Sequence, residues 1–111
     1  MTIEDFQKFI DEQDTFLRSV KSASRTGRER ILARTVKMSE EFGELCDEIL
    51  AFLGGQRSGK MKRRSAESLA GEFADVVITT FLLAKSTDVD VMKALGHKIR
   101  KIREKHNKQL Q

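Results

Sequence analysis

The sequence of 111 residues contains no proline, tryptophan or tyrosine, one cysteine and two histidines. The absence of proline removes the commonest helix breaker, so long helices can run without interruption. Cys46 has no second cysteine to pair with, which excludes a disulfide within the chain. His97 and His106 do not lie at a metal-ligand spacing, and no Glu-x-x-His pair is present, so we expect neither iron nor zinc.

Long apolar runs are also absent. The most apolar stretch, Phe73 to Ala84, is shorter than the roughly 20 residues that a helix needs to cross a bilayer, and it contains Asp75. The N-terminus does not have the charged and then apolar segments of a secretory leader. The sequence therefore predicts a soluble, cytoplasmic protein with no membrane partner.

Length and composition fit a single compact domain over residues 1–111, since 39% of the residues are apolar and no strand-like alternation competes with helix. Apolar residues recur at helical spacing in four segments. The sequence predicts an all-α four-helix bundle, with helices from Ile3 to Lys21, Arg28 to Leu53, Ser65 to Ser86 and Asp88 to Lys105. Because the third of these helices is apolar on nearly all sides, the other three helices of one chain cannot cover it, and we expect a homo-oligomer.

Local signals set the expected ends of these helices. Glycines 54 and 55 are a strong helix stop, a basic loop is expected over residues 55–64, and the tail 107–111 is expected to fray. The expected start signals are two pairs with capping-box spacing, Thr2 with Asp5 and Thr87 with Asp90, and Ser65 as an N-cap.

The third predicted helix is apolar nearly all the way round and yet carries Glu72 and Asp75. A helix with no polar face should run through the middle of a bundle. A buried carboxylate without a partner costs several kcal/mol, so acids in such a place are protonated, paired with a cation or bound to a metal. Their i, i+3 spacing makes the two acids lean from the same side of the helix.

The second predicted helix carries Glu41 and Glu44 at the same spacing, with Glu41 bordering the apolar stripe and Glu44 further out. Two carboxylates from each of two antiparallel helices would form a cage of hard oxygen ligands, which Mg²⁺ or Mn²⁺ prefers. Two plainer interpretations stay open. The acids around Glu41 could form a solvated helix face, and those of the third helix could pair with Lys37, Arg34 or a C-terminal cation.

The net charge is +4, but acids and bases are separated along the chain. Basic residues beside a carboxylate and metal site would suit a polyphosphate ligand, whereas basic residues along one helix face would suit nucleic acid. Charge alone does not decide between a polyphosphate ligand and nucleic acid. The basic residues are Arg57, Lys60, Lys62, Arg63 and Arg64 before the third helix, and Lys98, Arg100, Lys101, Arg103, Lys105 and Lys108 in the last one.

The acidic residues of the two central helices also form an ordered pair of motifs. The first is Glu-Glu-x-x-Glu, and the second is Glu-x-x-Asp in an apolar helix. This pair resembles the signature of the MazG-type all-α nucleoside-triphosphate pyrophosphohydrolases, and the resemblance covers roughly residues 34–105. The residues that carry it are Glu40, Glu41, Glu44, Glu72 and Asp75.

The resemblance implies a helical bundle assembled as a homodimer or homotetramer. It also implies hydrolysis of a nucleoside triphosphate, ribo or deoxy, to the monophosphate and pyrophosphate, a reaction suited to nucleotide-pool house-cleaning. Mg²⁺, with Mn²⁺ as the alternative, would be held by Glu41, Glu44, Glu72 and Asp75.

The same resemblance suggests roles outside the metal ligands. Glu40 is the candidate for orienting or deprotonating the attacking water, and the phosphates would be contacted by Lys98, Lys101 and Arg103. Plain solvation is the open alternative both for Glu40 and for the basic face of the last helix. The chain departs from the family at Ile102, where an asparagine is expected. The alternative function is a basic helical nucleic-acid-binding or oligomerisation module without catalysis. Such a module leaves the four acids unexplained, so we do not expect a nucleic-acid partner.

Overall fold

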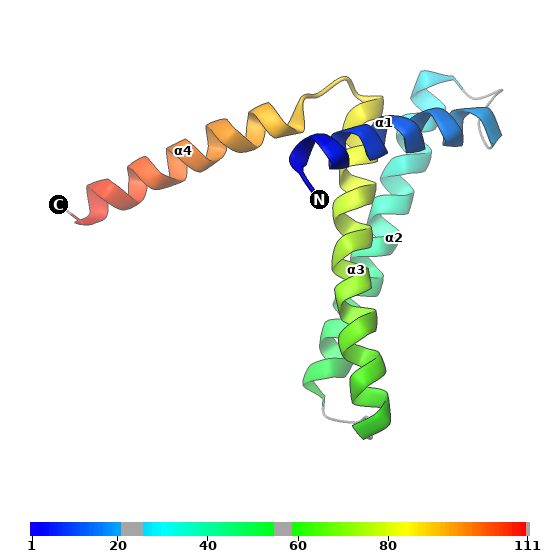
Figure 1. The fold of residues 1–111 in the computed structure, drawn as a ribbon, viewed down its shortest axis with the longest axis vertical. Helices are drawn as coiled ribbons and strands as arrows, with labels where there is room; N and C mark the ends of the chain where they lie inside the picture. Colours follow the sequence, from blue (N-terminus) through cyan, green and yellow to red (C-terminus); the bar gives the residue numbers. More distant parts are fainter. Residues whose placement is uncertain (21–25, 55–58, 111) are drawn as a thin grey trace.

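The computed structural model describes residues 1–20, 26–54 and 59–110. Within these ranges the chain forms four α-helices and no strand, which confirms the predicted all-α fold (Figure 1). The helices are α1 (Ile3–Val20), α2 (Gly27–Leu53), α3 (Gly59–Ser86) and α4 (Val91–Leu110). None of the helices in the described ranges is long and apolar enough to span a bilayer.

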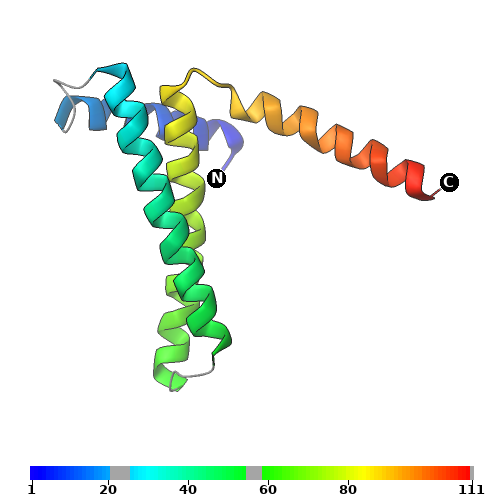
Figure 2. The same cartoon turned by 180° about the vertical axis from the view of Figure 1, so that it is seen from behind.

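Helices α2 and α3 lie side by side as an antiparallel pair, α1 crosses one end of the pair, and α4 extends away from all three (Figures 1 and 2). The core lies mainly where α1 crosses, and it includes Ile10 and Leu82. There the rings of Phe6 and Phe81 meet edge to face, with centroids 4.9 Å apart. Leu45, further along α2, is also buried. This crossing fixes the relative position of the three helices.

The first two helices begin with capping boxes. The Asp5 amide donates to Thr2 Oγ1 at 3.0 Å and the Thr2 amide donates to Asp5 Oδ2 at 2.9 Å, as predicted. A second capping box, which the sequence analysis missed, joins Thr26 and Glu29 at the start of α2. Because Thr26 is the N-cap, α2 begins at Gly27, one residue earlier than expected.

The predicted capping box at the start of the last helix is wrong. The Thr87 hydroxyl donates back to the Ala84 carbonyl, and Asp90 itself accepts from the Lys93 amide at 3.0 Å. Helix α4 therefore begins at Val91 and not at Asp88. Asp88 has φ of 59°, a left-handed conformation that aspartate tolerates better than most residues and that ends α3.

Two further expected boundaries are wrong. Helix α3 begins at Gly59, six residues before the predicted N-cap Ser65, so residues 59–64 belong to a helix and not to a loop. Lysine, arginine and methionine are good helix formers, and no proline interrupts them. The other part of the predicted loop, 55–58, lies outside the described residues. Helix α4 continues to Leu110, beyond the point where fraying was expected.

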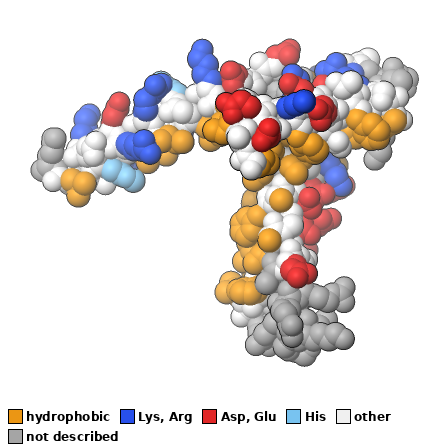
Figure 3. Space-filling model, viewed as in Figure 1, with side chains coloured by type: hydrophobic (Ala, Val, Ile, Leu, Met, Phe, Trp, Pro, Cys, Tyr) orange, Lys and Arg blue, Asp and Glu red, His pale blue; other side chains and the backbone are white. Residues whose placement is uncertain are grey.

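The single chain does not bury α3 on all sides, because α4 does not pack beside it, and the sequence analysis expected that so few helices could not cover this helix. Phe73 and Val77 on α3 are 51% and 48% exposed. Hydrophobic side chains line one edge of the α2–α3 pair, and acidic side chains line the opposite edge (Figure 3). Helix α4 also has an exposed apolar stripe of Leu95, Ile99 and Ile102. Two apolar surfaces thus remain uncovered.

Candidate metal centre

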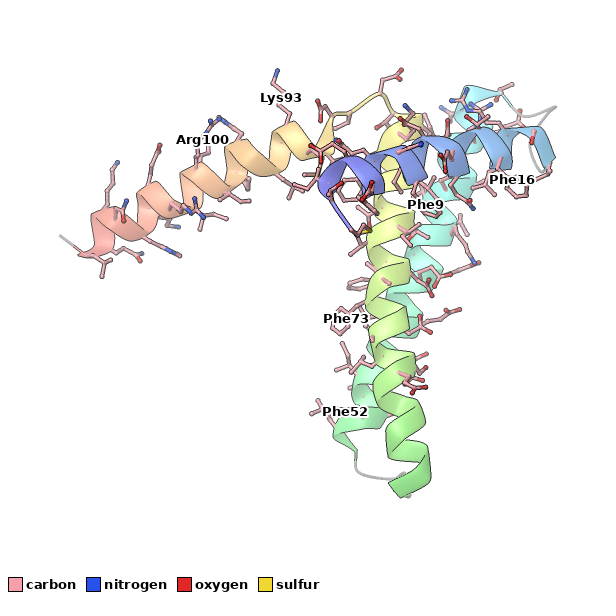
Figure 4. All side chains as sticks on the ribbon, in the orientation of Figure 1. Phe9, Phe16, Phe52, Phe73, Lys93 and Arg100 are labelled. Carbon is pink, nitrogen blue, oxygen red and sulfur yellow. The ribbon has the colours of Figure 1, made fainter. Side chains whose placement is uncertain are left out.

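Three carboxylates from two helices converge on the acidic edge of the α2–α3 pair. Glu41 comes from α2, and Glu72 and Asp75 come from α3, one helical turn apart. One oxygen from each of the three residues lies within 4.8 Å of the other two. The labelled Phe73 points to the opposite edge (Figure 4). The i, i+3 spacing and the antiparallel packing of the helices bring these acids together.

The carboxylate cluster of Glu41, Glu72 and Asp75 is poorly neutralised by cations. Lys37 Nζ lies 3.0 Å from Glu41 Oε1 and is itself mostly exposed. The other oxygen of Glu41 and one oxygen of Glu72 are buried, with no hydrogen-bond partner among the described residues. Within the same residues neither Glu72 nor Asp75 has an ion pair. Among the described residues, the alternative that the acids of the third helix pair with Lys37 or Arg34 is therefore not seen, and Lys37 pairs with Glu41 of α2 instead.

Glu44 lies outside the cluster but close enough to be repelled by its carboxylates. Desolvation, followed by repulsion from Glu44 and Asp75, raises the pKa of Glu72 above the usual glutamate range. The Glu41 carboxylate is the largest cause of a raised pKa at Glu44. A raised pKa means that the ionised carboxylate is less stable in the folded protein than in the unfolded chain. A bound cation would remove this cost at neutral pH.

The donor set fits a hard divalent cation. All of the converging ligand atoms are carboxylate oxygens, and neither histidine nor cysteine takes part in the cluster. Oxygen-only ligands favour Mg²⁺, Mn²⁺ or Ca²⁺ over zinc or copper. The two buried oxygens without partners need a cation or a donor from outside the described residues.

The structure brings together three of the four predicted metal ligands, Glu41, Glu72 and Asp75. The fourth, Glu44, is exposed and lies beside Glu41 without joining the group. This arrangement agrees with the expectation that Glu44 is further from the apolar stripe than Glu41. Glu40, the candidate general base, is exposed and lines a cavity together with Glu41 and Asp75.

The predicted phosphate contacts lie elsewhere. Lys98, Lys101 and Arg103 are exposed residues of α4. Because α4 extends away from the α2–α3 pair, these side chains do not approach the carboxylate cluster of their own chain (Figure 4).

Sequence reasoning missed the cavity itself, which has a volume of about 510 Å³ and lies between α1, α2 and α3. Its cationic residues come from one face of α2: Arg30, Arg34 and Lys37, followed on the same face by Glu41. The i, i+4, i+7, i+11 spacing of these four residues was a readable signal.

Arg34 is held by contacts with the other two helices. Its Nη1 lies 2.7 Å from Asp14 Oδ1 on α1, and it donates to the Leu82 carbonyl oxygen on α3 at 3.0 Å. Asp14 is buried and is also 3.3 Å from Arg18 Nε. These contacts join the three helices about two helical turns from Glu41.

Searches of curated proteins and of solved structures found no match to the chain. The family model described as the MazG nucleotide pyrophosphohydrolase domain matches residues 29–110, which include the whole carboxylate cluster and α4. Since this match covers most of the sequence, the protein belongs to the MazG nucleotide pyrophosphohydrolase domain family.

Proposed function

We propose that this protein is a Mg²⁺-dependent nucleoside-triphosphate pyrophosphohydrolase, which converts a ribo- or deoxyribonucleoside triphosphate and water into the monophosphate and pyrophosphate. The observation that carries the proposal is the convergence of Glu41, Glu72 and Asp75, with two buried oxygens lacking a partner among the described residues. Family membership supports the same reaction class. A role in clearing the nucleotide pool follows from this chemistry.

In the proposed reaction a water attacks the α-phosphorus in line with the leaving pyrophosphate, and the bond from that phosphorus to the bridging oxygen breaks. Glu41, Glu72 and Asp75 would hold the cation, with Glu44 beside them. When bound, a divalent cation neutralises phosphate oxygens and lowers the pKa of a coordinated water. Glu40 lines the adjoining cavity and would orient the water or accept its proton.

We further propose that the active form is a homodimer or homotetramer. The apolar stripe of α4 and the exposed edge around Phe73 are surfaces that a second copy would cover. On α4 the labelled Lys93 and Arg100 point away from the α2–α3 pair (Figure 4). Packing of α4 against another copy would carry Lys98, Lys101 and Arg103 to that copy's carboxylate cluster, where they would contact phosphates.

Incubation of the protein with each nucleoside triphosphate and Mg²⁺ should release pyrophosphate and the monophosphate in equal amounts. We expect this turnover because the carboxylate cluster could hold a cation and because the family is described as nucleotide pyrophosphohydrolases. Pyrophosphate release is measured by a coupled assay, with EDTA as the control. Salt-sensitive binding to random duplex DNA without any turnover would instead favour the nucleic-acid-binding alternative.

Variants of the base candidate and of a phosphate contact should affect different kinetic constants. Glu40→Gln should lower kcat by roughly 10²–10⁴-fold, as expected when a general base is lost. Lys101→Ala should mainly raise KM for the triphosphate, because it removes a phosphate contact that forms on binding. The matched control is Lys93→Ala on the same helix. An unchanged kcat in Glu40→Gln would refute its role as a base, and an unchanged KM in Lys101→Ala would refute the phosphate contact.

A further inference from the structure

The cavity between α1, α2 and α3 has charges of both signs in its wall. Glu40, Glu41 and Asp75 line one part of it, and Glu41 and Asp75 also belong to the carboxylate cluster. One face of α2 adds three cationic side chains to the same wall, those of Arg30, Arg34 and Lys37. The volume of about 510 Å³ is typical of ligand pockets, so a small anionic ligand at the cluster could also meet a cation of the protein.

The spacing along α2 shows which of these cations lies nearest to the cluster. At a rise of about 1.5 Å per residue, Lys37 is about 6 Å along the axis from Glu41, whereas Arg34 is about 10 Å away. Arg30 lies about one turn beyond Arg34. The charge of Arg34 is also offset by Asp14, 2.7 Å away. Lys37 is therefore the cation of this wall that is best placed to act at the cluster.

The ammonium group of Lys37 is accessible to a ligand. Its Nζ lies 3.0 Å from Glu41 Oε1, and its side chain is 58% exposed. An ammonium group carries three N–H donors on a flexible stem, so contact with one carboxylate oxygen leaves donors for a second anion. Once a cation at the cluster neutralises Glu41, the lysine can turn to that second anion, since an exposed ion pair is weak.

The charge of the cluster shows why a triphosphate would need such a contact. One divalent cation neutralises two of the three carboxylates of Glu41, Glu72 and Asp75, so the occupied site would still repel phosphates. The basic side chains of α4 do not approach the cluster of their own chain (Figure 4). Resting on the proposed function, we infer that Lys37 is a substrate-binding residue. It pairs with Glu41 in the free protein, and it contacts a phosphate when the triphosphate and the cation are bound.

The test measures binding without turnover. It uses Mn²⁺, which takes the same oxygen ligands as Mg²⁺, and the tightest-binding triphosphate analogue whose α,β-bridging oxygen is replaced by methylene. In calorimetry with Mn²⁺ present, Lys37→Gln should bind this analogue about ten- to a hundredfold more weakly than the wild type, because a hydrogen bond between charged groups is lost. By electron paramagnetic resonance, it should bind Mn²⁺ alone at least as tightly as the wild type, because a cation that competes for Glu41 is gone.

Two further variants show whether the effect belongs to this position. Lys85→Gln is the matched control, because Lys85 is also an exposed lysine, paired with Asp11 at 2.9 Å, and does not line this cavity. The same loss of charge there should leave binding of the analogue unchanged. Lys37→Arg should keep most of the affinity of the wild type, because a guanidinium also donates to phosphate with a positive charge.

The results that would overturn the role of Lys37 differ from those that would refute the reaction. Unchanged affinity of Lys37→Gln for the analogue would overturn the inference, and so would an equal loss in Lys85→Gln. If Lys37→Gln weakened the binding of Mn²⁺ alone as much as that of the analogue, the lysine would only maintain the cluster, which would also overturn it. A folded wild type that neither binds any analogue nor releases pyrophosphate would refute the proposed function itself.

Discussion

Glu72→Gln should lower kcat for triphosphate hydrolysis by more than about a hundredfold at any Mg²⁺ concentration, since loss of a residue that only hydrogen-bonds to a metal ligand already costs up to that factor. Glu72 supplies one of the three converging oxygens, and its amide replacement carries no charge to hold a cation. Initial rates over a range of Mg²⁺ concentrations check this result. The matched control is Glu67→Gln, an exposed acid of the same helix outside the cluster, which should keep wild-type kcat.

The same substitution should stabilise the protein when metal is absent. The pKa of Glu72 is raised in the folded state, so folding is most favoured while this group is protonated, and that stability is lost as the pH rises from about 4.3 through the raised pKa. In EDTA, Glu72→Gln should therefore melt at a higher temperature than the wild type, and this difference in Tm should grow as the pH rises through this interval. Added Mg²⁺ should raise the Tm of the wild type alone. A variant that melts below the wild type in EDTA would indicate that Glu72 is paired with a cation inside the protein.

Asp14→Ala should lower the free energy of unfolding by roughly 3–5 kcal/mol, because it leaves the buried guanidinium of Arg34 without its carboxylate. Asp14 is buried on α1, where it also pairs with Arg18, and its pairing with Arg34 ties α1 to α2. Urea denaturation at constant ionic strength would measure this loss.

The control for this variant is a more exposed ion pair of the same helix. Asp11 Oδ1 lies 2.9 Å from Lys85 Nζ, with both side chains well exposed, and it joins α1 to α3 as Asp14 joins α1 to α2. Asp11→Ala should cost no more than about 1 kcal/mol, since surface ion pairs contribute little. If the two variants were equally stable, the buried pair would contribute no more than a surface pair.

The helices and the acids of the carboxylate cluster could be predicted from the sequence because apolar periodicity and i, i+3 spacing are local, and the two acidic helices only had to pack side by side. Apolar periodicity marks the helices, and the i, i+3 spacing of Glu72 and Asp75 in an apolar helix marks the site. The Asp14 to Arg34 pair could not be predicted, because it depends on the angle at which α1 crosses α2. The start of α4 was misplaced because Thr87 and Asp90 have the spacing of a capping box. In the structure Asp88 has a left-handed backbone conformation, and it is Asp90 that accepts a hydrogen bond from the Lys93 amide.

Because α4 extends away from the other three helices, the backbone of its short connection to α3 sets the direction of the whole helix. Helix α4 has 20 residues, and residues 87–90 join it to α3. A helix of this length extends about 30 Å, so a rotation of about 10° at the connection displaces its far end by about 5 Å. Four backbone residues, with Asp88 in its left-handed conformation among them, thus set how far the basic side chains of α4 reach.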